Sequence, residues 1–156
     1  MNPFLAGVNQ KRLFAALLLG EAARAEDSHL RQALVQGALN HLGTALQLYF
    51  AEVAASYQSR DALQATSPAT LERQLSAMDK AAAEVVEILA LDEDDLSWLS
   101  RVLACQRALT APPAAVSRRE QEGIISTFSI APDQNTQPDL ADVERWLAAF
   151  TSMVEC

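Results

Sequence analysis

The chain has 156 residues, with 12 Lys and Arg against 20 Asp and Glu, and a formal net charge of −8. Half of the residues are hydrophobic and 6% are aromatic, and this length predicts a single domain over residues 1–156. The acidic balance argues against nucleic-acid binding and against attachment to anionic membranes, because both need clustered basic residues. The apolar run Leu13–Leu19 is too short for a membrane span and lacks the flanks of an export signal. We expect a cytoplasmic protein.

The first predicted helix extends from about Pro3 to Glu26. Asn2 is a suitable N-cap, and proline is favoured at the first helical position. Apolar residues recur at helical spacing along this segment, at Leu5, Val8, Leu13, Leu17 and Leu18, with Phe14 alongside. Asp27 and Ser28 are two candidate caps, so they mark the start of the next helix.

The second predicted helix runs from about His29 to Tyr57. Its apolar stripe has the three- and four-residue spacing of a buried helix face, and it consists of Leu30, Leu34, Ala38, Leu42, Ala45, Leu46, Tyr49 and Val53. Gly37 and Gly43 interrupt this helix. We expect them to allow close approach of a neighbouring helix, and the alternative is a groove that admits a small apolar ligand to the bundle core.

Two further helices follow a polar connector over residues 58–66. Ser67 and Pro68 form a second cap-and-proline pair, which predicts a strongly amphipathic helix to about Ala90. Asp94 or Asp95 is expected to cap a fourth helix, which reaches Leu109 before Pro112 and Pro113 end it.

The segment Ala111–Pro138 differs in composition, because it holds four of the six prolines. Within it, Gly123–Ile130 is the one strand-like run, and we expect it to lie extended across the helices. Asp139 then caps a last helix. Together these elements predict an all-α fold: an antiparallel up-and-down four-helix bundle with an additional C-terminal helix after a long Pro-containing crossing loop.

Arg24 and His29 fit the Arg-x4-His pattern, which resembles that of the HEPN ribonucleases, a family of small helical bundles. The resemblance implies that both side chains lie on one helix and meet across a dimer to cleave RNA. Here the pair straddles a predicted helix break, which instead suggests an exposed Arg and His flanking a cap.

Metal and cofactor motifs are weak in this sequence. Glu26 and His29 have the spacing of half of a di-iron site, but the second half is missing. The acidic run Asp92–Asp95 lacks the layout of a calcium loop. His41 is expected to be a half-buried, hydrogen-bonded residue, because no nucleophile or orienting carboxylate can be assigned to it. We therefore predict no cofactor and no metal, and only Arg24, His29 and His41 are candidate catalytic residues.

The stretch RAEDSHLRQAL…NHLGTALQLYFAEVA at Arg24–Ala54, the Ser-Pro start of the third helix and the DLADVERWL ending at Asp139–Leu147 resemble a family of small bacterial all-helical proteins of unknown function. This resemblance implies a bacterial cytosolic source, and it carries over no functional residues. The wide apolar stripes predict a non-catalytic interaction or scaffolding module that self-associates as a homodimer. The alternatives are a HEPN-type ribonuclease and a binder of small apolar ligands.

Overall fold

A computed structural model describes residues 2–111 and 137–156, and every regular element in these ranges is helical. The elements are α1 (Pro3–Arg24), α2 (Ser28–Ser56), the short η1 (Ala62–Gln64), α3 (Pro68–Ala77), α4 (Ala83–Glu93), α5 (Trp98–Thr110) and α7 (Leu140–Glu155). The predicted all-α class is therefore confirmed. The strand-like run Gly123–Ile130 lies outside the described residues. No described helix has both the length and the apolar character required to cross a membrane.

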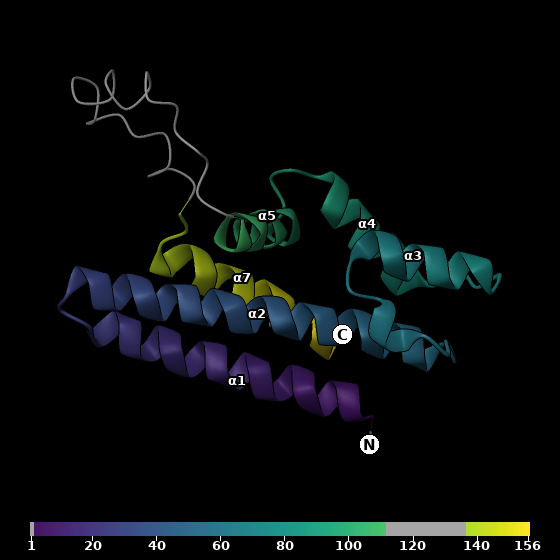
Figure 1. The fold of residues 1–156 in the computed structure, drawn as a ribbon, viewed down its shortest axis with the longest axis horizontal. Helices are drawn as coiled ribbons and strands as arrows, with labels where there is room; N and C mark the ends of the chain where they lie inside the picture. The colour runs from purple at the N-terminus through teal and green to yellow at the C-terminus, as the bar shows by residue number, and fades with distance from the viewer. Residues whose placement is uncertain (1, 112–136) are drawn as a thin grey trace.

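Helices α1 and α2 form a long antiparallel hairpin (Figure 1). The Asn2 side chain accepts a hydrogen bond from the Phe4 amide at 3.0 Å, and the Asp27 carboxylate accepts one from the Leu30 amide at 2.7 Å. Both side chains satisfy amide groups that have no partner within the helix. The predicted caps are therefore confirmed, and α1 ends two residues earlier than the sequence indicates.

The hairpin is closely packed because glycines on each helix receive side chains from the other. A Cβ atom added at Gly7 would lie 2.9 Å from Leu48 Cδ1, and one added at Gly37 would lie 3.2 Å from Leu18 Cδ1. The expected close approach at Gly37 is thus confirmed.

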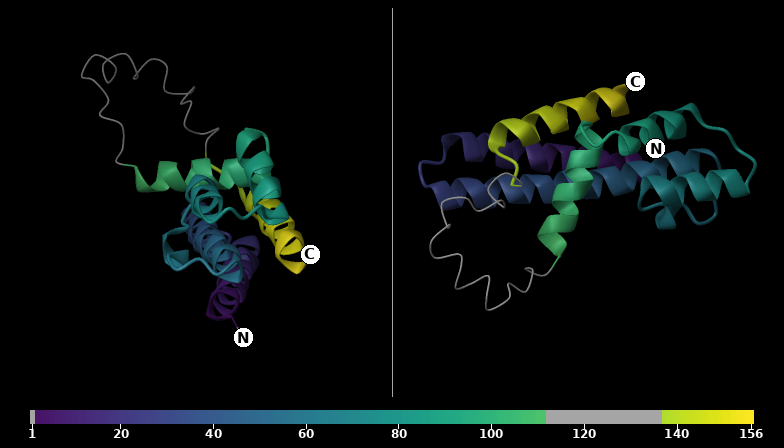
Figure 2. Two further views of the ribbon diagram at one scale, coloured as in Figure 1. Left: turned by 90° about the vertical axis from the view of Figure 1, so that its right-hand side faces the viewer. Right: turned by 90° about the horizontal axis from the view of Figure 1, so that it is seen from above.

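Helix α5 crosses α2 at a steep angle, as the view from above shows (Figure 2). At this crossing the Gln106 side chain lies on Gly43, where an added Cβ would be only 1.3 Å from Gln106 Nε2. Side chains therefore fill the space beside both Gly37 and Gly43, and neither glycine opens the bundle core to a ligand. The transverse course of α5 also differs from the lengthwise fourth helix of the predicted up-and-down bundle.

The third predicted helix is in fact two helices, α3 and α4, which form a small hairpin at one end of the molecule (Figure 1). The chain reverses after Ala77, where Asp79 has a φ of 56° and the Lys80 amide donates to the Leu75 carbonyl at 2.9 Å. Both halves still bury their part of the apolar stripe, at Leu75 and Ile88 among others. The prediction of one continuous helix was wrong, because the periodicity is the same on both sides of the turn.

The acidic run Asp92–Asp95 lies at the junction of α4 and α5. Helix α4 continues to Glu93, and the N-cap of α5 is Ser97, whose hydroxyl accepts from the Ser100 amide at 3.0 Å. The predicted caps Asp94 and Asp95 are therefore wrong. Ser97 takes this role because its buried hydroxyl also donates to the Leu91 carbonyl, which fixes the turn.

Helix α2 is the centre of the core, and it contacts α1, α3, α5 and α7. Asp139 caps α7 with a reciprocal capping box, as the sequence predicts. The ring of Phe150 on α7 is fully buried between α2 and α5, with centroids 5.8 Å from Tyr49 and 6.1 Å from Trp98. This aromatic contact joins the lengthwise helices to the transverse one.

Candidate functional site

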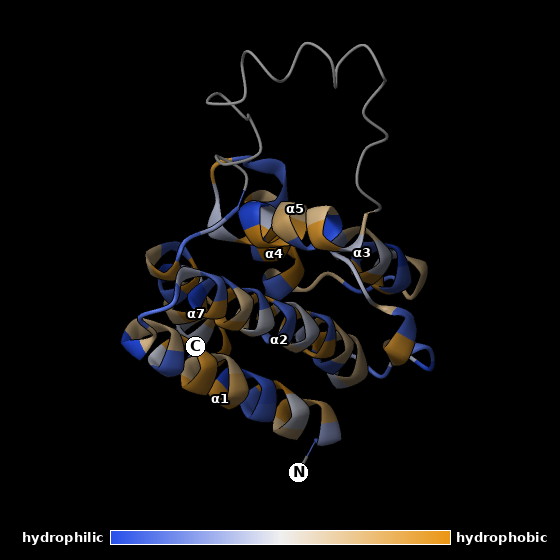
Figure 3. Ribbon diagram, turned by 60° about the vertical axis from the view of Figure 1, so that its left-hand side comes forward, coloured by the Kyte–Doolittle hydropathy of each residue, from blue (hydrophilic) through white to orange (hydrophobic). Residues whose placement is uncertain are grey.

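The outer face of α1 carries an apolar stripe, which consists of the exposed Leu13, Ala16 and Leu17 and the half-buried Gly20. Leu13 is 56% exposed and Leu17 is 60% exposed, although both are large hydrophobic residues. Hydrophobic segments are visible along α1 in Figure 3. A contiguous exposed apolar surface of this kind is typical of an interaction site.

A hollow of about 350 Å³ adjoins this stripe between α1 and α7, and Leu13, Ala16, Leu147 and Thr151 are among its lining residues. Arg12 forms its polar edge and ties the two helices together. Its guanidinium donates to Thr151 Oγ1 at 3.3 Å and to a Glu155 carboxylate oxygen at 2.8 Å. The stripe is therefore held on a braced pair of helices.

A second candidate is the cleft between α5 and α7, which has two adjoining hollows. One, of about 250 Å³, is lined mostly by small and apolar side chains that include Ala104, Cys105 and Pro138. The other, of about 470 Å³, is lined by residues that include Leu96, Trp98 and Arg145. Arg101, Asp142 and Trp146 line both hollows.

The charges of this cleft are unequally paired. Asp142 and Arg145 form an ion pair one helical turn apart on α7, whereas Arg101 forms no ion pair within residues 2–111 and 137–156. Burial raises the pKa of the Cys105 thiol, the Asp142 carboxylate adds to this, and the Arg101 guanidinium opposes it. The cleft therefore favours the neutral thiol at Cys105, which does not suit a nucleophile.

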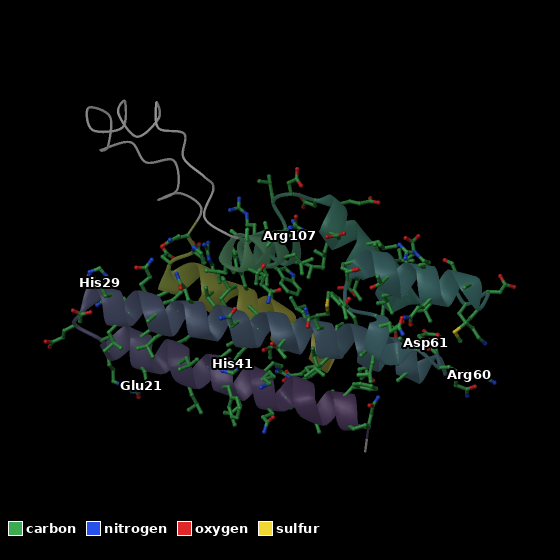
Figure 4. The ribbon with its side chains drawn as sticks, in the orientation of Figure 1. Glu21, His29, His41, Arg60, Asp61 and Arg107 are labelled. Carbon is green, nitrogen blue, oxygen red and sulfur yellow. The ribbon has the colours of Figure 1, made fainter. Side chains whose placement is uncertain are left out.

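Arg24 and His29 lie at the end of α1 and the start of α2, and both are exposed. Arg24 pairs with Glu21 at 2.5 Å, and Figure 4 shows His29 beside the turn between the two helices. This placement confirms that the Arg-x4-His pair straddles a helix break. It differs from the single-helix arrangement that the ribonuclease resemblance implies.

His41 lies in the middle of α2, far along the helix from His29 (Figure 4). It is half-buried, and the Phe14 ring meets it edge-on at 5.4 Å between centroids. Burial lowers the pKa of His41, and the positive charge of Lys11 lowers it further. Among the described residues no side chain hydrogen-bonds to His41, so the expected half-burial is confirmed but the expected hydrogen bond is not found.

Tyr49 lies in the C-terminal half of α2, where it is buried near a group of carboxylates. Burial raises the pKa of its phenol to about 12, and the negative charges of Glu52, Glu84 and Glu87 contribute. Burial also raises the pKa of Glu52. Neither Tyr49 nor His41 lines the hollows described above. In the part of the chain that the structure describes, no three His, Cys, Asp or Glu residues converge to hold a metal ion.

The sequence patterns did not identify Leu96, Arg101, Asp142 or Arg145 as residues that line a shared cleft. The cleft unites two helices that lie about 40 residues apart, and its form depends on the transverse course of α5. No local spacing encodes that crossing. The sequence did contain a signal for the α1 stripe. The run Leu13–Leu19 is apolar around the whole helix, whereas a helix that is buried on one face has polar residues on the other, so some of these apolar residues had to be exposed or covered by another element.

Comparison with known proteins assigns a family but no activity. No curated protein and no solved structure has a significant match to the chain. A model of a family of unknown function (DUF6586) matches residues 1–156. This match confirms the predicted resemblance to a family of unknown function, and the chain belongs to that family, DUF6586.

Proposed function

We propose that this protein is a non-catalytic interaction module that associates with a second copy of itself through the outer stripe of α1. The observation that carries the proposal is the exposure of Leu13 and Leu17 on a helix that is otherwise firmly packed. Apolar side chains left in water favour association, because each gains about 25 cal/mol for every Å² that a partner covers.

The stripe is self-complementary when two α1 helices pack antiparallel. In a two-fold pair, residue i of one copy meets residue j of the other, and j meets i. If the crossing centre lies between Ala16 and Leu17, then Leu13 faces Gly20 and Leu17 faces Ala16. Each large side chain thus meets a small one. The space at Gly20 is open, since an added Cβ would meet only the Arg24 guanidinium, at 4.0 Å.

The charges of α1 also support a second copy as the occupant. The chain has a net charge of −8, but α1 carries three basic residues and a single acidic one, Glu21. Two α1 faces therefore meet without the repulsion that other faces of an acidic protein would cause.

Sedimentation equilibrium of the full chain over a range of micromolar concentrations tests this proposal. A contact built on one helix pair covers less area than a stable dimer needs, so we expect a weak, concentration-dependent dimer. Leu17→Glu should weaken association by about tenfold or more, because it places a charge in the apolar contact. Leu63→Glu is the matched control, since Leu63 is 72% exposed and lies outside α1.

A wild-type chain that stays monomeric at the highest concentrations would overturn the proposal. So would equal association of Leu17→Glu and Leu63→Glu. Circular dichroism of both variants would establish that the fold is retained, as their exposed positions predict.

A further inference from the structure

We propose that the cleft between α5 and α7 binds a small organic anion with an apolar body, such as an aliphatic or aromatic carboxylate. The two hollows of the cleft, of about 250 and 470 Å³, adjoin at Arg101, Asp142 and Trp146. Together they have the size of an ordinary small-molecule site. None of the α1 stripe lines this cleft, so the inference does not depend on self-association.

Arg101 selects for an anion. Because Asp142 and Arg145 form an ion pair, Arg101 is the charged lining residue that has no ion-pair partner within residues 2–111 and 137–156, in a chain of net charge −8. The Arg101 side chain is exposed at the place where the two hollows adjoin. A guanidinium presents a planar pair of donors that matches a carboxylate, so the anionic group of the ligand would bind there.

Apolar side chains beside Arg101 select for an apolar body. Trp146 forms a buried wall with 7% exposure, and Trp98 is held in place by its tilted contact with Phe150. Leu96 is 76% exposed at the same hollow, which leaves a large hydrophobic surface in water. A ligand body that covers Leu96 and Trp98 would remove this surface from water, with the favourable free energy of apolar burial.

Intrinsic fluorescence gives a readout specific to this cleft, because the chain has only two tryptophans and both line it. The full chain would be titrated with cyclohexanebutyrate and, separately, with the uncharged cyclohexanebutanol. Neither compound absorbs where tryptophan does. We expect a saturable change in tryptophan emission with the carboxylate, and binding of the alcohol weaker by about tenfold or more, because it forms no charge-assisted hydrogen bond.

Two arginine variants complete the test. Arg101→Gln should lower the affinity for the carboxylate by about tenfold or more and leave that for the alcohol unchanged. Arg73→Gln, which removes an exposed arginine on α3, should bind the carboxylate as the wild type does. The proposal is overturned by the absence of saturable binding, by equal affinities for acid and alcohol, or by equal effects of the two substitutions.

Discussion

The α1–α2 hairpin and the α3–α5 region differ in how their helices pack. In the hairpin, glycines receive leucines along two long helices, so the contact is continuous and the surplus apolar residues point outward on α1. In the α3–α5 region, short helices turn and cross, and hollows remain between α5 and its neighbours. Continuous packing along α1 and α2 thus leaves large apolar side chains exposed on α1, whereas the crossing helices leave hollows between them.

The largest expected effect comes from breaking the aromatic contact between these regions. Phe150→Ala should lower the free energy of unfolding by about 3–5 kcal/mol, because the ring is fully buried and its removal leaves a cavity. Urea unfolding followed by circular dichroism measures this. Leu63→Ala, at an exposed position, should change stability by less than about 0.5 kcal/mol. A comparable loss in both variants would contradict the central place of Phe150.

The same junction should be sensitive to high pH through Tyr49. Its pKa is raised from 10.0 to about 12, so the unfolded chain loses this proton first as the pH rises. The stabilising contribution of Tyr49 is therefore full below about pH 10 and is lost as the pH rises through about 12, by at most roughly 3 kcal/mol, because solvent near the phenol screens part of the effect. Urea unfolding at stepped alkaline pH measures the slope. Tyr49→Phe should flatten it, and an unchanged slope would contradict the assignment.

A smaller effect on stability is expected at the start of α3, within the α3–α5 region. The Ser67 hydroxyl accepts from the Thr70 amide at 3.2 Å, and Thr70 Oγ1 accepts from the Ser67 amide at 2.9 Å. Ser67→Ala should cost about 1 kcal/mol, because it leaves a helix amide without its partner. Thermal unfolding compares it with Ser76→Ala, an exposed serine on the same helix that caps nothing. Equal stability of these variants would show that the cap is unimportant.

The smallest effect is expected at the crossing itself. Gly43→Ala gains up to about 1 kcal/mol of helix propensity but displaces the end of the flexible Gln106 side chain. We expect the net change in unfolding free energy to stay within about 1 kcal/mol. Adding Gln106→Ala should then make Gly43→Ala more favourable, which a double-mutant cycle measures. A large loss of unfolding free energy in Gly43→Ala alone would contradict this expectation. It would mean that backbone atoms, and not the end of the Gln106 side chain, fill the space beside Gly43.

Local signals in the sequence predicted the helices and most of their starts. Asn2, Asp27, Ser67 and Asp139 each cap a helix as expected, because capping depends on residues within one turn. The reversal at Asp79 was missed, since helical periodicity continues through it. The cap of α5 was placed in the acidic run because the contact between Ser97 and the Leu91 carbonyl is visible only in three dimensions.

The two candidate sites also differ in whether local sequence signals could predict them. The α1 stripe could be anticipated, because an all-round apolar run on an amphipathic helix is a local feature. The cleft could not, because Arg101 and Trp146 come from separate helices whose crossing no single segment determines. His41 was correctly expected to be half-buried, but the sequence could not show that its neighbours are Phe14 and Lys11.

The proposed self-association rests on one register, in which Leu13 of one copy faces Gly20 of the other. A compensating exchange tests that register by sedimentation equilibrium. Gly20→Leu places two leucines opposite each other, and Leu13→Ala leaves a gap, so each should weaken the dimer by about tenfold. The double variant restores one large and one small side chain at every contact, and we predict that it recovers most of the wild-type affinity. If the double variant dimerises as weakly as the two single effects combined would give, the proposed register is contradicted.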